Sequence, residues 1–162
     1  MFRTRVLTTM AVFIALGTIG AQLLWFPAGI AKAYPVQHAV NVMAAITLGP
    51  GPAVVIAFMT GLIRNMLGLG TLLAFPGGMI GAFLAGLLYK KFRRKILAVV
   101  GEVVGTGIIG SLFSVPYANL LMGSSLGAFV FLPSFFVSSI SGAFIGYFVV
   151  IRVKQTNQLQ NV

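Results

Sequence analysis

The chain has 162 residues, of which 59% are hydrophobic and 7% are charged, and its mean hydropathy is +1.04. Soluble domains do not reach this composition, so the sequence predicts an integral membrane protein. The net charge of +10 would suggest nucleic-acid binding in a soluble protein but reports orientation in a membrane protein, and the absence of cysteine excludes disulfides and thiolate metal sites.

Six apolar segments follow one another along the chain. They cover about residues 5–24, 37–49, 51–67, 75–92, 96–115 and 127–151. A transmembrane helix needs roughly 20 mostly apolar residues, so the chain suits one all-α domain, residues 1–162, with six transmembrane helices and a disordered tail at about 155–162. The second segment is short, ~21 Å long, and we expect it not to cross the hydrocarbon core unaided.

Prolines mark the expected helix starts. Pro35, Pro52 and Pro76 stand at or just before the first turn of a segment, where a missing N–H is harmless. The stretch GPGP, from Gly49 to residue 52, predicts a tight hairpin between the second and third segments. Pro133 is ambiguous, because it fits either the start of the last helix or a kink in a helix that has already begun.

Basic residues indicate the orientation in the membrane. If both termini are cytoplasmic, only Lys32 and Arg64 fall outside or in the outer leaflet, and nine fall inside: Arg3, Arg5, Lys90, Lys91, Arg93, Arg94, Lys95, Arg152 and Lys154. The positive-inside rule therefore predicts cytoplasmic termini. The cluster KKFRRK is explained as a topology signal, with an anionic-lipid or partner-docking site as the alternative.

The N-terminal part imitates a secretory signal, since Arg3 and Arg5 precede an apolar run and the AKA stretch at 31–33 looks like a cleavage site. The run from Val6 to Leu24 is longer than a signal core, and Trp25 fits an interfacial anchor at the end of a full span. We therefore expect an intact first helix.

Most of the side chains that are costly in lipid collect near the expected outer ends of the helices. They are Trp25, Lys32, Tyr34, Gln37, His38, Asn41, Arg64, Asn65, Tyr117, Asn119, Ser124 and Ser125. An arginine at such a depth usually faces the bundle interior or a cavity, so Arg64 is expected to help shape an outward-opening pocket. The alternative is that the Arg64 side chain snorkels to the lipid headgroups. Asn65 lies about 100° further round the helix, so the two side chains cannot both face the same lipid.

Glu102 is the only acid, about seven residues into the fifth helix. A carboxylate there must be neutral, paired or in water, so a structural pairing and a ligand or coupling role both stay open. Pairing with Arg64 is attractive, although the estimated depths differ by ~10 Å. His38 fits a hydrogen-bonded structural residue better than a metal ligand, because no second His or Cys exists. We expect no metal and no cofactor.

Small residues recur at four-residue spacing, which lets helix backbones approach closely in lipid. The stripes are Ala11 and Ala15; Gly77, Gly81 and Ala85; Gly101 and Gly105; and Ser138, Gly142 and Gly146. We expect most of them to be internal packing, whereas the stripe on the first helix is open to a partner membrane protein.

Familiar catalytic motifs are missing from the sequence. It has no Walker-type phosphate loop, no His-Glu-x-x-His zinc motif and no G-x-S-x-G elbow. With one acidic residue and one histidine, the chain has few side chains that could act as general acid or base, so we do not expect an enzyme. The halves show no convincing inverted repeat, which favours substrate binding with energy supplied elsewhere over a stand-alone secondary transporter.

Four stretches resemble the ThiW family over roughly Val6 to Tyr147: WFPAGIAKAYPVQHAVNV, LIRNMLGLGTLLAFPGGMIGAFLAGLLY, GEVVGTGIIGS and FLPSFFVSSISGAFIGY. Such proteins are thiazole-specific substrate-binding S components of energy-coupling-factor (ECF) vitamin transporters. The resemblance implies six helices with cytoplasmic termini in a prokaryotic cell membrane, and capture of hydroxyethylthiazole, a thiamine precursor, near the outer face.

The resemblance also implies partners. S components associate with a transmembrane coupling protein and two cytoplasmic ATPase subunits, and deliver substrate inward by toppling in the membrane. An Ala-x-x-x-Ala motif in their first helix contacts the coupling protein, and AVFIA supplies it here as Ala11 and Ala15.

Hydroxyethylthiazole is a small neutral aromatic ring with one ring nitrogen and one hydroxyl, which calls for an apolar slot and a few placed hydrogen bonds. The candidate substrate-binding residues are Trp25, Lys32, Tyr34, His38, Asn41, Arg64, Asn65, Glu102 and Tyr117. Arg64 is expected to orient neighbours or to hold a loop that closes the pocket. Two alternatives stay open: an S component for another small vitamin or precursor, and a small channel or passive facilitator.

Overall fold

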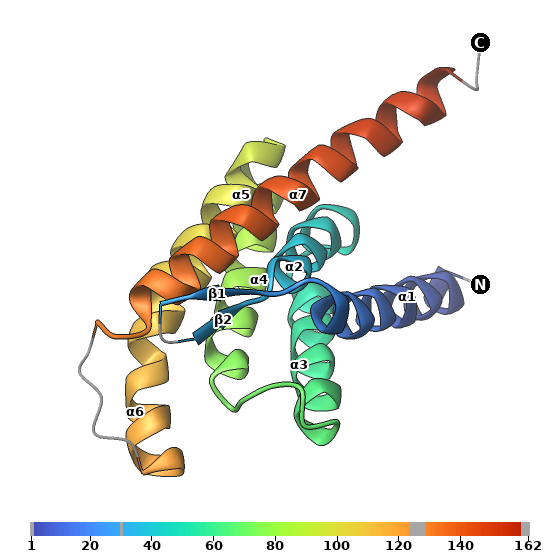
Figure 1. The fold of residues 1–162 in the computed structure, drawn as a ribbon. Helices are drawn as coiled ribbons and strands as arrows, with labels where there is room; N and C mark the ends of the chain where they lie inside the picture. Colours follow the sequence, from blue (N-terminus) through green and yellow to red (C-terminus); the bar gives the residue numbers. More distant parts are fainter. Residues whose placement is uncertain (1, 30, 124–128, 160–162) are drawn as a thin grey trace.

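The structure, a computed structural model, describes residues 2–29, 31–123 and 129–159. Helices dominate these residues, and the predicted all-α class is confirmed (Figure 1). The elements in chain order are α1 (Phe2–Leu23), β1 (Phe26–Ala28), β2 (Ala31–Ala33), α2 (Pro35–Leu48), α3 (Pro50–Met66), α4 (Ala74–Phe92), α5 (Lys95–Glu102), the π-helix η1 (Val103–Gly110), α6 (Ser111–Met122) and α7 (Leu132–Leu159).

Among the described residues, six continuous helical stretches correspond to the six predicted segments, because α5, η1 and α6 continue into one another. Three helices in the described ranges are long and apolar enough to cross a membrane by themselves: Thr4–Leu23, Lys95–Leu120 and Leu132–Val153. The helix α2 has only 14 residues, as expected from the sequence. Six crossings and cytoplasmic termini stay predictions.

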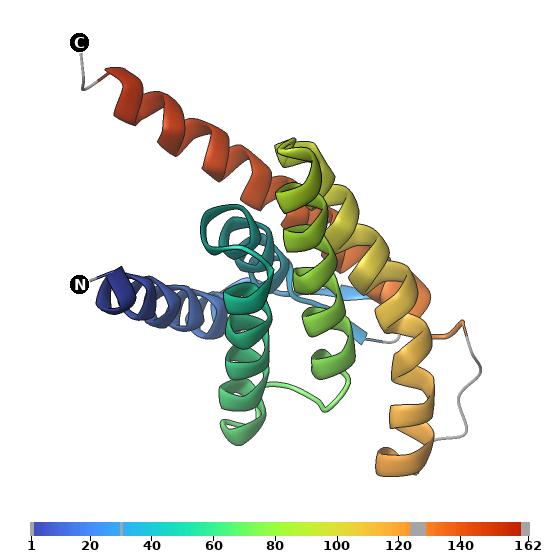
Figure 2. The ribbon, with the colours of Figure 1, turned by 180° about the vertical axis from the view of Figure 1, so that it is seen from behind.

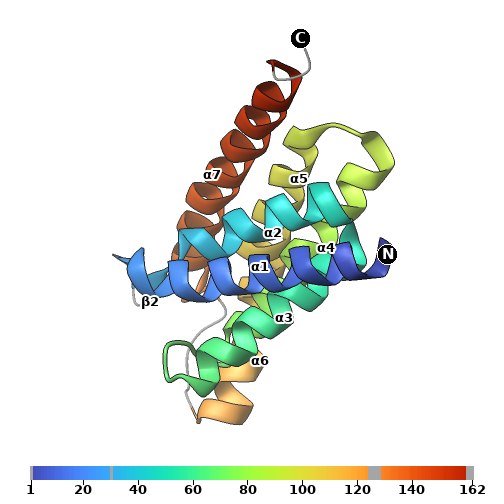
Figure 3. The same cartoon turned by 90° about the vertical axis from the view of Figure 1, so that its right-hand side faces the viewer.

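The helices pack around α4, which contacts α2, α3, α5 and η1. From behind, α3, α4 and the continuous α5–η1–α6 rod stand side by side (Figure 2). The helix α1 lies against α2 and α3 at one side of the bundle (Figure 3), and the C-terminal part of α7 projects beyond the other helices (Figure 1). This helix reaches Leu159, and residues 160–162 lie outside the described ranges, so the disordered tail stays a prediction.

The connection after α1 forms a short antiparallel hairpin of β1 and β2, which the sequence did not predict. Two contacts fasten this hairpin to α7. The Ser134 hydroxyl donates a hydrogen bond to the Ala28 carbonyl, and the Tyr34 N–H donates to Ser138 Oγ at 2.8 Å. The hairpin is therefore held beside the start of α7.

The proline signals gave correct helix starts. Pro35 begins α2, and Pro52 and Pro76 each lie in the first turn of α3 and α4. Pro133 is the second residue of α7 and follows a turn at residues 129–131, so it belongs to a helix start and not to a kink. The α2–α3 hairpin also forms as predicted, with Gly49 at a φ of 88°, where glycine is favoured.

The fifth helix is longer than predicted. It continues past residue 115 and through Pro116 to Met122, so Tyr117 and Asn119 lie in α6 and not in a connection. The prediction was wrong because an internal proline usually ends a helix, whereas packed membrane helices tolerate one. The serines at positions 124 and 125 lie outside the described residues.

Small residues form the closest helix crossings. A Cβ added at Gly105 would lie 2.7 Å from the Gly81 Cα, and one added at Gly146 would lie 2.6 Å from the Ala39 carbonyl oxygen. The stripes in α4, α5–η1 and α7 are therefore internal packing, as predicted. The stripe on α1 differs, because its two alanines are exposed.

Candidate functional site

A partly open cavity of about 770 Å³ lies where the hairpin, the start of α2, the α3–α4 connection and the start of α7 meet. Ligand-binding cavities in proteins commonly measure roughly 300–1,000 Å³, so this one has a suitable size for a small molecule. The cavity has a polar wall, an apolar wall and a rim that carries one cation.

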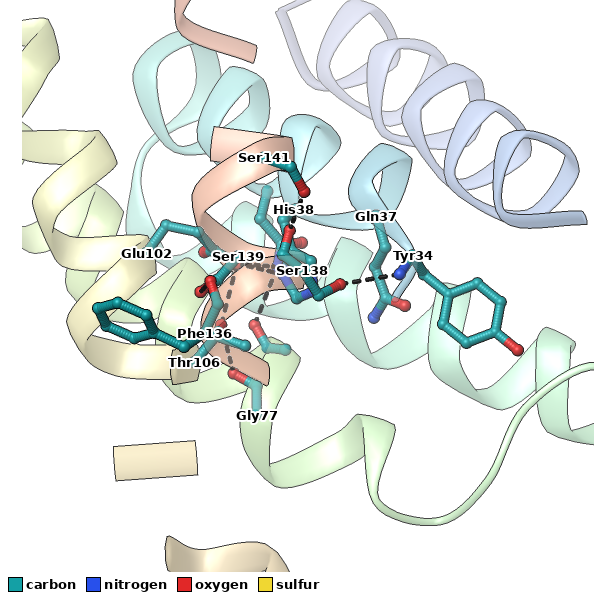
Figure 4. Close-up of polar contacts among 12 residues, drawn as sticks. Tyr34, Gln37, His38, Gly77, Glu102, Thr106, Phe136, Ser138, Ser139 and Ser141 are labelled. Carbon is teal, nitrogen blue, oxygen red and sulfur yellow. Dashed lines mark hydrogen bonds and ion pairs between the residues drawn. The ribbon is translucent and has the colours of Figure 1, made fainter. Parts of the chain in front are cut away.

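The polar wall comes from the start of α2. Tyr34, Gln37 and His38 line the cavity together with Ser138 of α7 and Thr106 of η1, and Figure 4 shows the hydrogen bond from the Tyr34 N–H to Ser138. Pro35 begins the helix between the first two of these residues, so the local sequence itself starts α2 at the cavity.

Arg64, at the end of α3, is 2% exposed and lines the cavity. Its Nη1 donates to Gln37 Oε1, its Nη2 donates to the Leu69 carbonyl at 3.1 Å, and its guanidinium lies 4.0 Å from the centroid of the Tyr34 ring. The snorkelling alternative is therefore wrong, because these contacts hold the side chain inside the protein. Leu69 belongs to the α3–α4 connection, so this bond ties Arg64 to a loop that lines the cavity.

Asn65 faces a different way from its neighbour Arg64. Its Nδ2 donates to the Gly61 carbonyl at 2.8 Å and to the Thr71 carbonyl at 3.1 Å, and it does not line the cavity. The difference follows from the turn of about 100° between consecutive helical residues. Asn65 therefore ties the α3–α4 connection to α3, and Thr71 of that connection lines the cavity.

Glu102 lies behind the polar wall and is completely buried. Its Oε1 lies 2.8 Å from His38 Nδ1, 3.0 Å from Asn41 Nδ2 and 3.0 Å from Thr106 Oγ1. The structural pairing of Glu102 is thus with His38, and the considered pairing with Arg64 does not occur. Helix crossing decides this, since α2 packs between α4 and α7 and brings His38 to the level of Glu102.

His38 fits a hydrogen-bonded residue, as predicted, and it also faces the cavity. Within the described ranges, no group of three or more His, Asp or Glu side chains comes together in a way that would hold a metal ion. The side chains that line the cavity can offer hydrogen bonds and stacking to a ligand.

The apolar wall combines residues of the α3–α4 connection, α6 and the start of α7. Leu73, Ala118 and Phe131 form a small buried cluster against which Phe135 packs. The rings of Phe131 and Phe135 meet edge to face with centroids 6.2 Å apart. Such a wall suits the face of a small aromatic ring.

The rim is formed by Trp25 and Lys32, which lie on either side of the hairpin turn. The Lys32 Nζ lies 4.0 Å from the centroid of the Trp25 ring. Both residues line the cavity, and Trp25 is half-exposed. An aromatic and a basic side chain that follow α1 therefore lie together at the cavity.

The nine candidate residues divide into two groups. Those that line the cavity are Trp25, Lys32, Tyr34, His38 and Arg64; those that do not are Asn41, Asn65, Glu102 and Tyr117. Asn41 and Glu102 are buried behind the wall, and Tyr117 lies half-exposed on α6. The substrate-binding role of all nine stays a prediction.

Several lining residues were absent from the candidate set. They are Gln37, Thr106, Phe131, Ser134, Phe135 and Ser138. Ser138 did carry a signal, since it opens the small-residue stripe of α7. The two phenylalanines carried none, because an apolar membrane segment offers many similar residues and only the packing selects among them.

The sequence model of the thiamine-precursor transporter protein (ThiW) family matches residues 7–156. The chain belongs to the ThiW family. Among proteins with curated functions, none matches this chain. Membership of the ThiW family makes it a membrane transport protein for a thiamine precursor, with a small-molecule substrate, and not an enzyme.

Proposed function

We propose that this ThiW protein is the substrate-binding membrane subunit of an ECF-type importer in a prokaryotic cell membrane. It captures hydroxyethylthiazole at the outer face and delivers it inward together with a transmembrane coupling protein and two cytoplasmic ATPase subunits. The proposal rests on one observation: this member of a thiamine-precursor transporter family has a cavity lined by both apolar aromatic and hydrogen-bonding side chains.

The two walls suit a small ring alcohol. Phe131 and Phe135 offer apolar contacts for the ring, while Gln37, His38 and Ser138 offer donors and acceptors for its nitrogen and hydroxyl. Recognition of this kind uses many apolar contacts for affinity and a few polar groups for orientation.

The course of α4 supports an outward-facing cavity. Ala74 and Gly78 at its start line the cavity, and Lys90 and Lys91 lie in its last turn. Its 19 residues span ~28 Å, close to the thickness of a hydrocarbon core. If the basic cluster is cytoplasmic, as the positive-inside rule predicts, the cavity belongs to the outer side, with six crossings and cytoplasmic termini.

The coupling role rests on two observations. The sequence holds no phosphate loop, so energy from ATP must come from another chain. Ala11 and Ala15 are exposed on α1, where a coupling helix can approach them closely.

Binding by the purified protein tests the proposal. Hydroxyethylthiazole should bind and should outcompete other small vitamins and precursors in a panel, as measured by isothermal titration calorimetry. Tight binding of a different vitamin instead would make the chain an S component for that compound.

Uptake by vesicles separates the coupled subunit from a passive facilitator. Vesicles that contain the protein together with the coupling protein, the ATPases and ATP should accumulate labelled hydroxyethylthiazole, and vesicles that contain the protein alone should not. Equilibration in vesicles without ATP and partners would identify a channel or facilitator.

A further inference from the structure

His38 has one ring nitrogen engaged and one available. Its Nδ1 lies 2.8 Å from Glu102 Oε1, and the residue lines the cavity. Within the described part of the chain, no hydrogen bond to Nε2 occurs, and Nε2 is not among the buried unpartnered atoms. The nitrogen Nε2 is therefore the polar atom that His38 offers to a molecule in the cavity.

The surroundings of Glu102 determine which ring nitrogen carries the proton. Asn41 Nδ2 faces two oxygens, Glu102 Oε1 at 3.0 Å and the Gly78 carbonyl at 3.2 Å, so this atom is the amide nitrogen that donates to both. Glu102 Oε1 thus accepts hydrogen bonds, as a carboxylate does. His38 Nδ1 faces the same accepting oxygen at 2.8 Å, so we assign the proton to Nδ1 as the donor.

A proton on Nδ1 alone makes Nε2 a hydrogen-bond acceptor. Lys32 and Arg64, which also line the cavity, can only donate hydrogen bonds. In the neutral Nδ1–H imidazole, Nε2 therefore supplies an acceptor beside these two donors.

We propose that Glu102 fixes His38 as the neutral Nδ1–H tautomer, so that His38 Nε2 accepts a hydrogen bond from a hydroxyl group of the ligand. Glu102 is then a positioning residue that does not touch the ligand. The identity of the donor as the hydroxyl of hydroxyethylthiazole rests on the proposed function. The assignment selects ligands that present a hydrogen-bond donor at this wall and rejects those whose only oxygen is an acceptor.

Nitrogen NMR of the ligand-free protein tests the tautomer directly. His38 is the only histidine, so histidine labelled with ¹⁵N in the ring gives the two nitrogen signals of one imidazole. We expect one protonated nitrogen, Nδ1, and one unprotonated nitrogen, Nε2. Two protonated nitrogens, or a proton on Nε2 alone, would overturn the proposal.

Ligand analogues test the direction of the hydrogen bond. The methyl ether of hydroxyethylthiazole keeps the oxygen but cannot donate, and the 5-ethyl analogue lacks the oxygen. Both should bind at least about tenfold more weakly than the alcohol, which corresponds to the loss of one hydrogen bond to a buried group. An ether that binds as tightly as the alcohol would show that Nε2 does not accept from the hydroxyl.

The variant Glu102→Gln tests the positioning role, because glutamine keeps the size of the side chain and removes its charge. The preference for alcohol over ether should shrink at least about threefold, since the amide no longer enforces one tautomer. Ser141→Ala is the matched control, because the Ser141 hydroxyl bonds only within α7 and does not line the cavity. An unchanged preference in a folded Glu102→Gln protein would refute the role of Glu102.

The outcomes for the proposed function and for this proposal are separable. If hydroxyethylthiazole does not bind the folded wild-type protein, the proposed function fails, and the ligand-free NMR spectrum still decides the tautomer. If the alcohol binds and the ether binds equally well, the proposed function survives and the hydrogen-bond assignment fails. The wild-type measurements do not depend on whether Glu102→Gln folds.

Discussion

The stripes of small residues inside the bundle and the stripe on α1 share the same four-residue spacing but face different surroundings. In α4 and η1, Gly81 and Gly105 meet backbone to backbone inside the bundle. On α1, Ala11 and Ala15 are exposed. Spacing alone therefore predicts that something approaches a helix closely, and only the packing tells whether the partner is in the same chain.

The burial of the helices that carry these stripes explains why the stripe on α1 is exposed and those in α4 and η1 are not. Only 17% of the apolar window in Thr4–Leu23 is buried, against 50% in Lys95–Leu120. Large apolar side chains flank the exposed alanines on α1, among them Leu7, Val12, Leu16 and Ile19. In a bilayer such a face meets either lipid or another membrane protein, and small residues within it favour the protein.

Bulky residues on α1 should produce the largest effect. In the double variant Ala11→Leu/Ala15→Leu, uptake into vesicles with the complete coupling module should fall to background, because leucine keeps the partner helix at a distance. Hydroxyethylthiazole binding by the purified variant should stay unchanged, since neither alanine lines the cavity. Normal uptake together with lost binding would contradict the assignment of this stripe.

A substitution in the internal stripe should lower the stability of the protein. In Gly105→Ala the new Cβ would lie 2.7 Å from the Gly81 Cα, and because backbone cannot rotate away, α4 and η1 must separate. We expect a loss of about 1–3 kcal/mol in the free energy of unfolding, measured by denaturation in detergent.

The control for Gly105→Ala is Gly51→Ala in the first turn of α3. An added Cβ there meets no atom within 4 Å, so the free energy of unfolding should not fall. Equal stability of the two variants would mean that the α4–η1 crossing is not close-packed.

A substitution on the inner face of α1 should have the smallest effect on stability. A Cβ at Gly17 would lie 3.0 Å from a side-chain carbon of Thr60, which can shift slightly. Alanine also favours the helical state over glycine, so the two contributions nearly cancel and Gly17→Ala should change stability by less than about 0.5 kcal/mol. A large loss in the same denaturation assay would indicate that α1 packs more tightly than its exposure suggests.

The sequence was sufficient to predict where the helical segments lie. Apolar runs and prolines gave the starts of α2, α3 and α4 to within two residues. The end of the fifth helix was wrong because local rules treat Pro116 as a breaker, whereas packing decides whether a helix continues. The β1–β2 hairpin was missed because its three-residue strands carry no recognisable period.

The site was predicted less completely than the fold. Polar residues in an apolar chain are few, so Arg64, His38 and Glu102 stood out at once. Their partners did not, because His38 and Glu102 are 64 positions apart and meet only through the crossing of α2 with its neighbours. Sequence can therefore nominate the costly side chains, and the helix crossings decide which of them pair and which face the cavity.

The rim of the cavity carries the only tryptophan of the chain. The Trp25 ring lies under the Lys32 ammonium group and lines the cavity, so a molecule bound in the cavity changes the surroundings of the one indole in the chain. The fluorescence emission of Trp25 in the purified protein can therefore report occupancy of the cavity without an attached dye.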